Sequence, residues 1–326
     1  MAQVNRPSAR KVAQRTRAVR PGAGFAHRVH PQPAPHIVKR SSARLFSPAS
    51  ITWQINRERL LIVGGARSLL MQIAHPLIAA AVAEHSGFHE DPLGRLQRTM
   101  EFLSVVHFGT AAEARSAADR LHAVHGAVRG VLHEPAGGFR AGSRYRARDP
   151  ELLLWVHATL VDTSLLVFRH YVQDLSAEEE ERYYQDSKTI ARLQRIPESK
   201  IPRDVRDFRN YMNRMIDSGP IAVSATAREL ARAILSPAVP PTTALVAAIT
   251  GFISVGLLPG KLREGFGLRW GPGRQFLLDA SGCASRALLP LLPSAWRVEP
   301  AARTAELASG RPGIQPSRRW MPKAET

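Results

Sequence analysis

The sequence predicts an all-α fold, and three observations support this prediction. Signals that start helices recur along the chain, whereas few segments alternate apolar and polar residues with the period of two that half-buried strands show. Aromatic residues make up only 6% of the chain, and alanine and leucine are plentiful, which favours helices packed through aliphatic contacts. The 326 residues are 44% hydrophobic and 22% charged, as in ordinary soluble globular proteins. We expect one domain over residues 49–295, built from about ten helices.

Local start signals fix most of the expected helix boundaries. Asp149-Pro150 places an N-cap residue before a proline at the first helical position. Capping boxes begin at Thr110 and Ser176, each with a glutamate three residues later. Helices are therefore expected over residues 51–63, 66–86, 92–108, 111–129, 150–174, 177–194, 203–217, 226–235, 242–256 and 273–288.

Proline and glycine interrupt this pattern at several places. Pro76 should kink the second helix, because a proline removes a backbone hydrogen bond. Residues 137–150 are interpreted as a loop, and the most apolar run, 243–260, as a buried helix that is too interrupted to span a membrane. Gly64-Gly65 lacks the spacing of a phosphate-binding motif, so we expect a close helix–helix crossing there.

Positive charge is concentrated at the N-terminus. The formal net charge is +18, and residues 1–50 contain ten lysines and arginines but no aspartate or glutamate. This composition predicts a disordered basic tail over residues 1–48. Such a tail could touch anionic lipid or nucleic acid, or simply add solubility. We expect peripheral membrane contact at most and no specific nucleic-acid binding. Residues 296–326 are expected to form an irregular tail.

Several classes of protein lack support in the sequence. The N-terminus has no apolar stretch typical of a secretory signal, and the single Cys283 excludes a disulfide framework. These features favour a cytoplasmic protein, with membrane association as the second option. The motifs CxxC, HExxH and GxSxG do not occur, so neither a structural zinc site nor an α/β-hydrolase nucleophile is expected.

Polar residues on apolar helix faces are the candidate functional residues. Arg95 and Thr99 share one stripe of the expected 92–108 helix, and Arg98 lies one step around it. A buried guanidinium without a partner is costly, so Arg95 needs a carboxylate, a backbone carbonyl or an anionic ligand. An ion pair with Asp91 or Glu84 would satisfy it structurally, without any function.

Histidines recur on the apolar stripes of later helices. His125 lies on a stripe otherwise made of alanine, leucine and valine, and His122 lies on its flank. His157 shares a face with the leucines of the 150–174 helix. Such histidines are usually hydrogen-bonded core residues, but a neutral imidazole is also a good iron ligand once its second nitrogen is fixed. The residues alone leave both interpretations open.

Several stretches, taken together, resemble one known family. In order along the chain they resemble the catalytic domain of mpaB-type oxygenases and latex-clearing rubber oxygenases, over about residues 50–290. The resemblance implies an all-helical, globin-like fold that holds b-type haem. The stretches are INRERLLIVGGARSLLMQIAHPLIAAAVAEHSGF (55–88), DPLGRLQRT (91–99), VHGAVRG (124–130), YRARDPELLLWVHATLVD (145–162) and GLLP (256–259).

The resemblance also implies a catalytic cluster. The family's distal Arg-x-x-Lys-Thr pattern corresponds to Arg95, Arg98 and Thr99, with arginine replacing lysine at the second position. Arg95 would hold a haem propionate or stabilise oxygen at the iron through charge-assisted hydrogen bonds, which are about twice as strong as neutral ones. The family's glutamate, a candidate base, has no clear match, although Glu84 and Glu90 lie nearby in the sequence.

The iron ligand that the resemblance implies is a proximal histidine. His125 matches it best, so His125 is the expected metal ligand. His122 and His157 remain further candidates for binding the cofactor, together with Arg95.

The expected activity follows from this resemblance. We expect an oxygenase that uses haem b and molecular oxygen to insert oxygen into, or oxidatively cleave, a carbon–carbon double bond. The substrate would be a small apolar molecule such as a lipid or a prenyl chain; rubber is not expected, because its cleavage needs a secreted enzyme. Alternatives are a non-catalytic haem sensor or carrier, a non-haem metal oxidoreductase using His122, His125 and His157, and a cofactor-free protein acting through its basic tail.

The distal assignment predicts the behaviour of one variant. Arg95→Ala should keep haem but lose turnover, because the guanidinium would act on the reacting oxygen and would not anchor the fold. Haem content by absorbance and oxygen uptake with the substrate measure the two properties. Full activity of the variant would remove Arg95 from the distal cluster.

Overall fold

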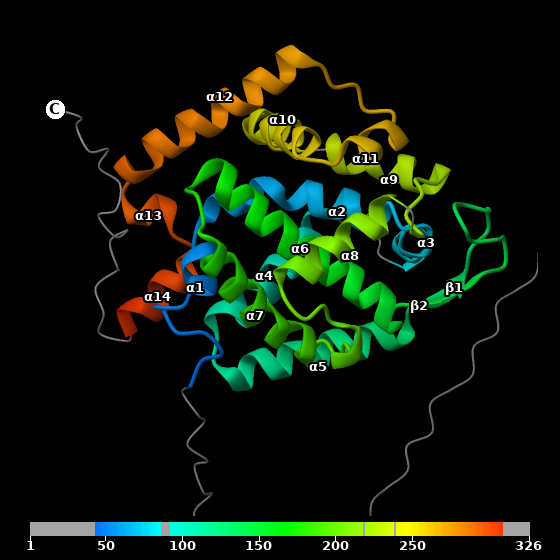
Figure 1. The fold of residues 1–326 in the computed structure, drawn as a ribbon, viewed down its shortest axis with the longest axis horizontal. Helices are drawn as coiled ribbons and strands as arrows, with labels where there is room; N and C mark the ends of the chain where they lie inside the picture. Colours follow the sequence, from blue (N-terminus) through cyan, green and yellow to red (C-terminus); the bar gives the residue numbers. More distant parts are fainter. Residues whose placement is uncertain (1–42, 86–91, 218, 238, 309–326) are drawn as a thin grey trace, which may run out of the picture. The chain divides into compact units, whose positions relative to one another are not determined.

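The computed structural model describes residues 43–85, 92–217, 219–237 and 239–308. Within these ranges it contains fourteen α-helices, three short 3-10 helices and one two-stranded sheet (Figure 1). The all-α prediction is therefore confirmed, whereas the globin-like arrangement stays a prediction. Most of the predicted basic tail, residues 1–42, lies outside the described residues.

The first helices are divided more sharply than the sequence predicts. Helix α1 (Ile51–Asn56) is followed by the 3-10 helix η1 (Arg59–Gly64), α2 (Gly65–Ile73) and α3 (Pro76–His85). The single kinked helix predicted over 66–86 is wrong, since the segment Arg59–Ile73 and α3 meet at 109°. Pro76 begins a new helix, where its missing N–H is not needed.

Three of the next four helices begin where their capping signals predict. Helices α4 (Pro92–Phe108) and α5 (Ala111–Ala127) flank the capping box at Thr110, in which both reciprocal hydrogen bonds are present. Helix α6 (Pro150–Tyr171) has Asp149 as its N-cap, and α7 (Ala177–Leu193) begins with the complete capping box at Ser176. These boundaries were predictable because capping is a local interaction.

A small hairpin occupies part of the predicted loop. Strands β1 (Arg129–Val131) and β2 (Arg144–Arg146) pair antiparallel, with Gly130 opposite Tyr145. The interpretation of 137–150 as a loop is therefore wrong for β2. Tyr145, which is buried on the inner side of β2, gives the hairpin a reason to form.

The C-terminal part of the described chain is also helical. The predicted irregular tail is wrong for α14, because the buried Ala302 and Ala305 pack against Trp53 and Val106 in one cluster. The elements of this part are η2 (Glu198–Lys200), α8 (Val205–Asp217), α9 (Ala225–Leu235), α10 (Pro241–Gly256), α11 (Gly260–Gly265), α12 (Pro272–Leu288), η3 (Leu289–Leu291), α13 (Ser294–Arg297) and α14 (Pro300–Ala308).

Helix α10 differs from its prediction in another way. It was expected to be buried, yet most residues of its first half are exposed, and burial begins only near Ile253. Its apolar composition, which suggested burial, therefore does not reflect packing within the domain.

Helix α6 runs through the middle of the fold (Figure 1) and contacts η1, α2, α7 and α12. By length and composition α6 could cross a membrane, but 61% of the relevant window is buried within the protein. Trp155 on α6 is fully buried and donates its indole N–H to the carbonyl of Met71 on α2, at 3.0 Å. A buried indole needs such a partner, so this bond ties α6 to α2.

The predicted close helix crossing is found at Gly64 but not at Gly65. A Cβ atom on Gly64 would lie 2.6 Å from Thr163 Cγ2 and 2.7 Å from Val167 Cγ2, both on α6. A Cβ atom on Gly65 would meet no heavy atom of the described residues within 4 Å. Only Gly64 therefore sets the distance between the start of α2 and α6.

These neighbouring glycines make a matched pair of variants. Gly64→Ala should lower the free energy of unfolding by about 1–3 kcal/mol, because the new methyl group overpacks the contact with α6. Gly65 has helical backbone angles, so Gly65→Ala should be neutral or stabilising by up to about 1 kcal/mol. Urea unfolding of both variants measures this, and equal effects would contradict the assignment.

Candidate functional site

The predicted site residues come from the same end of a helix pair. Helices α4 and α5 pack together and are joined by only Gly109 and Thr110. The start of α4 therefore lies near the end of α5, where His125 is found. Arg98 and Thr99 lie further along α4 and are exposed, although the sequence placed them on an apolar face. Arg95 lies on α4 as predicted, but its side chain is outside the described part of the structure.

The state of His125 suits a metal ligand. Its imidazole is half-buried, and burial lowers its pKa, with further lowering by His122 and Arg148. His125 is therefore neutral at pH 7, with a nitrogen lone pair available. The backbone carbonyl of His122 accepts hydrogen bonds from Nε and Nη2 of Arg148, at 2.9 and 2.7 Å, which holds this guanidinium at the end of α5.

Arginines gather immediately after α5. In the hairpin Arg129 lies directly opposite Arg146, and Arg144 lies opposite Val131. All three arginines are exposed, and like charges directly opposite each other on paired strands are destabilising. An anionic group would relieve this repulsion, so the hairpin edge is suited to carboxylates or phosphates.

A hydrogen-bonded cluster joins this hairpin to the end of α3. The Tyr145 hydroxyl donates to Glu84 Oε2 at 2.5 Å, and His133 Nε2 lies 3.1 Å from Glu84 Oε1. His85 Nε2 lies 3.2 Å from the Tyr145 hydroxyl. Burial raises the pKa of Tyr145, and the hydrogen bond to Glu84 raises it further. Tyr145 therefore stays protonated, and Glu84 accepts its proton in a hydrogen bond.

Only part of this cluster is indicated by the sequence. Glu84 was considered as a base without a clear alignment, whereas Tyr145 and His133 were missed. Their roles depend on the pairing of β1 with β2 and on the contact of both strands with α3. The tyrosine within an otherwise arginine-rich strand, RYR, was the available signal.

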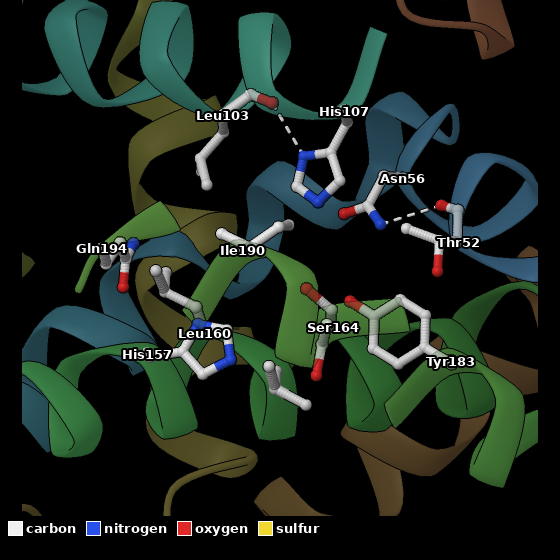
Figure 2. Close-up of a pocket in the computed structure, with 12 residues that line it drawn as sticks. Thr52, Asn56, Leu103, His107, His157, Leu160, Ser164, Tyr183, Ile190 and Gln194 are labelled. Carbon is white, nitrogen blue, oxygen red and sulfur yellow. Dashed lines mark hydrogen bonds between the residues drawn. The ribbon is translucent and has the colours of Figure 1, made fainter. Parts of the chain in front are cut away.

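A separate cavity lies inside the domain, between α1, α4, α6 and α7 (Figure 2). Its volume is about 60 Å³, and His107 of α4 and His157 of α6 both line it. The two rings enter from opposite sides, and hydroxyl and amide groups such as Ser164, Tyr183 and Asn56 complete the polar wall. His157 was a predicted site residue, whereas His107 was missed.

The two cavity histidines are both uncharged. Burial lowers the pKa of each to about 4. Nδ1 of His107 bonds the carbonyl of Leu103 at 2.7 Å, so Nδ1 carries the proton and Nε2 keeps its lone pair. His157 has no hydrogen bond to another described residue. The cavity therefore presents imidazole groups with unused hydrogen-bonding capacity.

The volume of the internal cavity limits what it could hold. A cavity of about 60 Å³ is far below the roughly 300–1,000 Å³ typical of pockets for drug-sized ligands, so a porphyrin does not fit between His107 and His157. The end of the α4–α5 pair instead carries the half-buried His125, with Arg148 held nearby by its two hydrogen bonds to the carbonyl of His122.

A metal site made of protein ligands alone has less support. Within the described residues, no group of three or more His, Cys, Asp or Glu side chains could hold a metal ion. His157 lines the internal cavity, whereas His122 and His125 belong to the last turns of α5. This separation argues against the non-haem alternative that combined these three histidines.

Comparison with known proteins gives a family match over most of the chain. The family described as "ER-bound oxygenase mpaB/B'/Rubber oxygenase, catalytic domain" matches residues 52–287. This range includes α4, α5 and the hairpin. It also includes His122 and His125 at the end of α5, and His107 and His157 at the internal cavity. It agrees with the resemblance found in the sequence.

Two curated proteins are similar to part of the chain. An uncharacterised protein of Mycobacterium bovis and one of Mycobacterium tuberculosis are each 27% identical to the chain over 220 residues. The match covers 64% of this chain and 81% of each relative. No solved structure matches the chain.

The buried histidines predict a dependence of stability on pH. An unfolded histidine has a pKa of 6.5, and His107 and His157 titrate at about 4 when folded. Below pH 6.5 the unfolded chain binds more protons, so stability is lost as pH falls to about 4, by on the order of 3 kcal/mol for each histidine. Urea unfolding at several pH values should show this slope.

A pair of variants assigns the slope to these residues. The double variant His107→Gln/His157→Gln should unfold with a weaker pH dependence between pH 6.5 and 4, although it is less stable overall. His133→Gln, whose side chain is 76% exposed, should keep the full slope. The same slope in the double variant would show that these two histidines are not buried in neutral form.

Proposed function

The chain belongs to the mpaB and rubber oxygenase family, and on this premise we propose that it is a haem b-dependent oxygenase of a small apolar substrate. Membership in the family indicates an oxygenase, and hence an oxidoreductase. The proposal goes further by naming haem b as the cofactor and His125 as its ligand. The observation that carries it is the neutral, half-buried imidazole of His125 beside the start of α4.

The residues at the end of α5 fit the cofactor chemically. His125 offers a ring nitrogen lone pair to iron, because burial keeps it unprotonated. Arg129, Arg146 and Arg148 supply positive charge for the two propionates. When bound, haem supplies the activation of oxygen, while the protein determines axial ligation, polarity and access.

The other residues of this region would act on substrate and protons. Arg98 and Thr99, with Arg95, would donate hydrogen bonds on the side of α4. Glu84 would accept a proton from the substrate at Oε1 or Oε2, because its carboxylate is partly exposed and already accepts from Tyr145. Tyr145 would then orient the carboxylate, since its raised pKa keeps the hydroxyl protonated.

The substrate class rests on the family description. The family description includes a rubber oxygenase, which favours an unsaturated hydrocarbon substrate for this chain. Oxygen would be inserted at a carbon–carbon double bond, or the bond would be cleaved oxidatively. Squalene, an unsaturated isoprenoid, is a suitable first test compound.

Two histidine variants test the cofactor site. His125→Ala should lose haem or shift its absorbance spectrum, because the iron loses its protein ligand. His157→Ala is the matched control, since it removes a buried imidazole from a cavity that cannot hold a porphyrin, and it should keep the normal spectrum. Absorbance of both purified variants after haem is supplied measures this. A normal spectrum for His125→Ala would move the ligand role to another histidine.

Activity requires a separate measurement. Oxygen uptake with squalene, followed by mass spectrometry of products formed under ¹⁸O₂, should show oxygen incorporated into the substrate. Glu84→Gln should slow this reaction while leaving the haem spectrum unchanged. Haem binding without turnover on any of a panel of unsaturated lipids would favour the non-catalytic sensor or carrier.

A further inference from the structure

Helices α10 and α12 expose large apolar side chains next to each other. Leu245 and Ile249 of α10, and Phe276 and Leu277 in the first turns of α12, are between 50% and 71% exposed. The two helices contact each other and lie side by side across the top of Figure 1. Exposed apolar patches of this kind often mark interaction sites, so we ask which partner or surface this face binds.

A groove opens within the same face. It has a volume of about 290 Å³ and lies between the end of α9, α10 and the segment that leads into α12. Leu235, Phe252, Val255 and Leu268 line it. Trp270 also lines it and stacks at a tilt on Phe252, with ring centroids 5.1 Å apart. The volume of the groove is large enough for part of an acyl chain, and its mainly apolar lining suits such a chain.

Two arginines stand at the rim of this groove. Arg269 and Arg274 both line it and are exposed, and Arg274 donates from Nη1 to the carbonyl of Arg269 at 2.8 Å. No ion pair of either arginine with a carboxylate of the described residues is present. Their positive charges are therefore available to an external anion, and arginine binds phosphate especially well.

We propose that this face docks on a lipid bilayer with anionic head groups. Leu245, Ile249, Phe276 and Leu277 would enter the acyl region, and Arg269 and Arg274 would hold lipid phosphates at its surface. The groove would take an acyl chain of a lipid bound in this way. The inference rests on exposed residues far from His125 and does not depend on the proposed cofactor or reaction.

The positive charge of this face and the length of α10 favour the surface of a bilayer over a second copy of the chain or a membrane-spanning helix. If a second copy of the chain packed on this face by two-fold symmetry, Arg269 and Arg274 of both copies would lie in the same interface. Their like charges would repel, which disfavours such a dimer. Helix α10 has 16 residues, fewer than the roughly 20 that a membrane span needs. An apolar helix face with a basic rim is typical of a helix that lies in the membrane interface.

Vesicle binding by the full chain tests the proposal. We would compare phosphatidylcholine vesicles with and without phosphatidylglycerol in a flotation assay. Arg269→Glu/Arg274→Glu should weaken binding to the anionic vesicles by about tenfold or more, and Phe276→Ser/Leu277→Ser should weaken it comparably. Both sites are exposed, so the variants should melt at the same temperature as the parent chain.

A matched control separates this face from general electrostatics and from the basic tail. Arg115→Glu/Arg120→Glu makes the same change of charge on exposed positions of α5, on the opposite side of the molecule in Figure 1, and should change binding less than about threefold. Lipids brominated on the acyl chain should quench the fluorescence of Trp270, and Trp270→Phe should remove much of that quenching.

Three results would overturn the proposal. Unchanged vesicle binding in both Arg269→Glu/Arg274→Glu and Phe276→Ser/Leu277→Ser would place any lipid contact elsewhere, as on the basic tail. Equal losses in the α5 control would show that only net charge matters. Loss of a dimer in Phe276→Ser/Leu277→Ser, measured by analytical ultracentrifugation with vesicle binding intact, would assign the face to a second copy of the chain.

Discussion

The arrangement of the domain depends on one buried guanidinium. Arg67 on α2 is 3% exposed and donates to Asp162 Oδ2 at 2.7 Å, to Thr163 Oγ1 at 2.5 Å and to the carbonyl of Leu257 at 2.8 Å. These bonds join α2, the central helix α6 and the turn after α10. Asp162 is 31% exposed, so water screens part of this ion pair. Removing the partner of the buried Arg67 guanidinium would still destabilise the fold, because an uncompensated charge would remain. The close contact at Gly64, less than one turn earlier, lets the guanidinium reach α6.

With α6 held in this position, the domain contains two separate polar regions, one uncharged and internal and the other charged. The internal cavity is lined by the uncharged His107 and His157 and is closed to large molecules. The region beside α3, α5 and the hairpin is charged and open, with Glu84 and the arginines around His125. Because α6 follows β2 directly, its position also determines where Tyr145 meets Glu84. We place the proposed chemistry in the charged region, which contains His125 and Glu84.

The sequence predicted what local interactions determine. The capping boxes at Thr110 and Ser176 set helix starts correctly, because each box involves only neighbouring residues. The sequence predicted a kink at Pro76 but not its angle of 109°. The exposure of α10 and the role of His107 could not be predicted, because each depends on which distant element packs against the segment. Of the candidate site residues, His125 and Arg98 lie on helices, as the sequence pattern predicts. The partnership of Glu84 with Tyr145 could not be predicted, because it requires the hairpin.

An absorbance spectrum of the purified, unmodified chain, together with a pyridine haemochrome assay, would show whether this chain binds haem b as we propose. We expect a Soret band and about one b-type haem per chain, either as purified or after haem is supplied. A chain that stays colourless after haem is supplied would rule out haem b, and the oxygenase chemistry of the family would then need a different cofactor here.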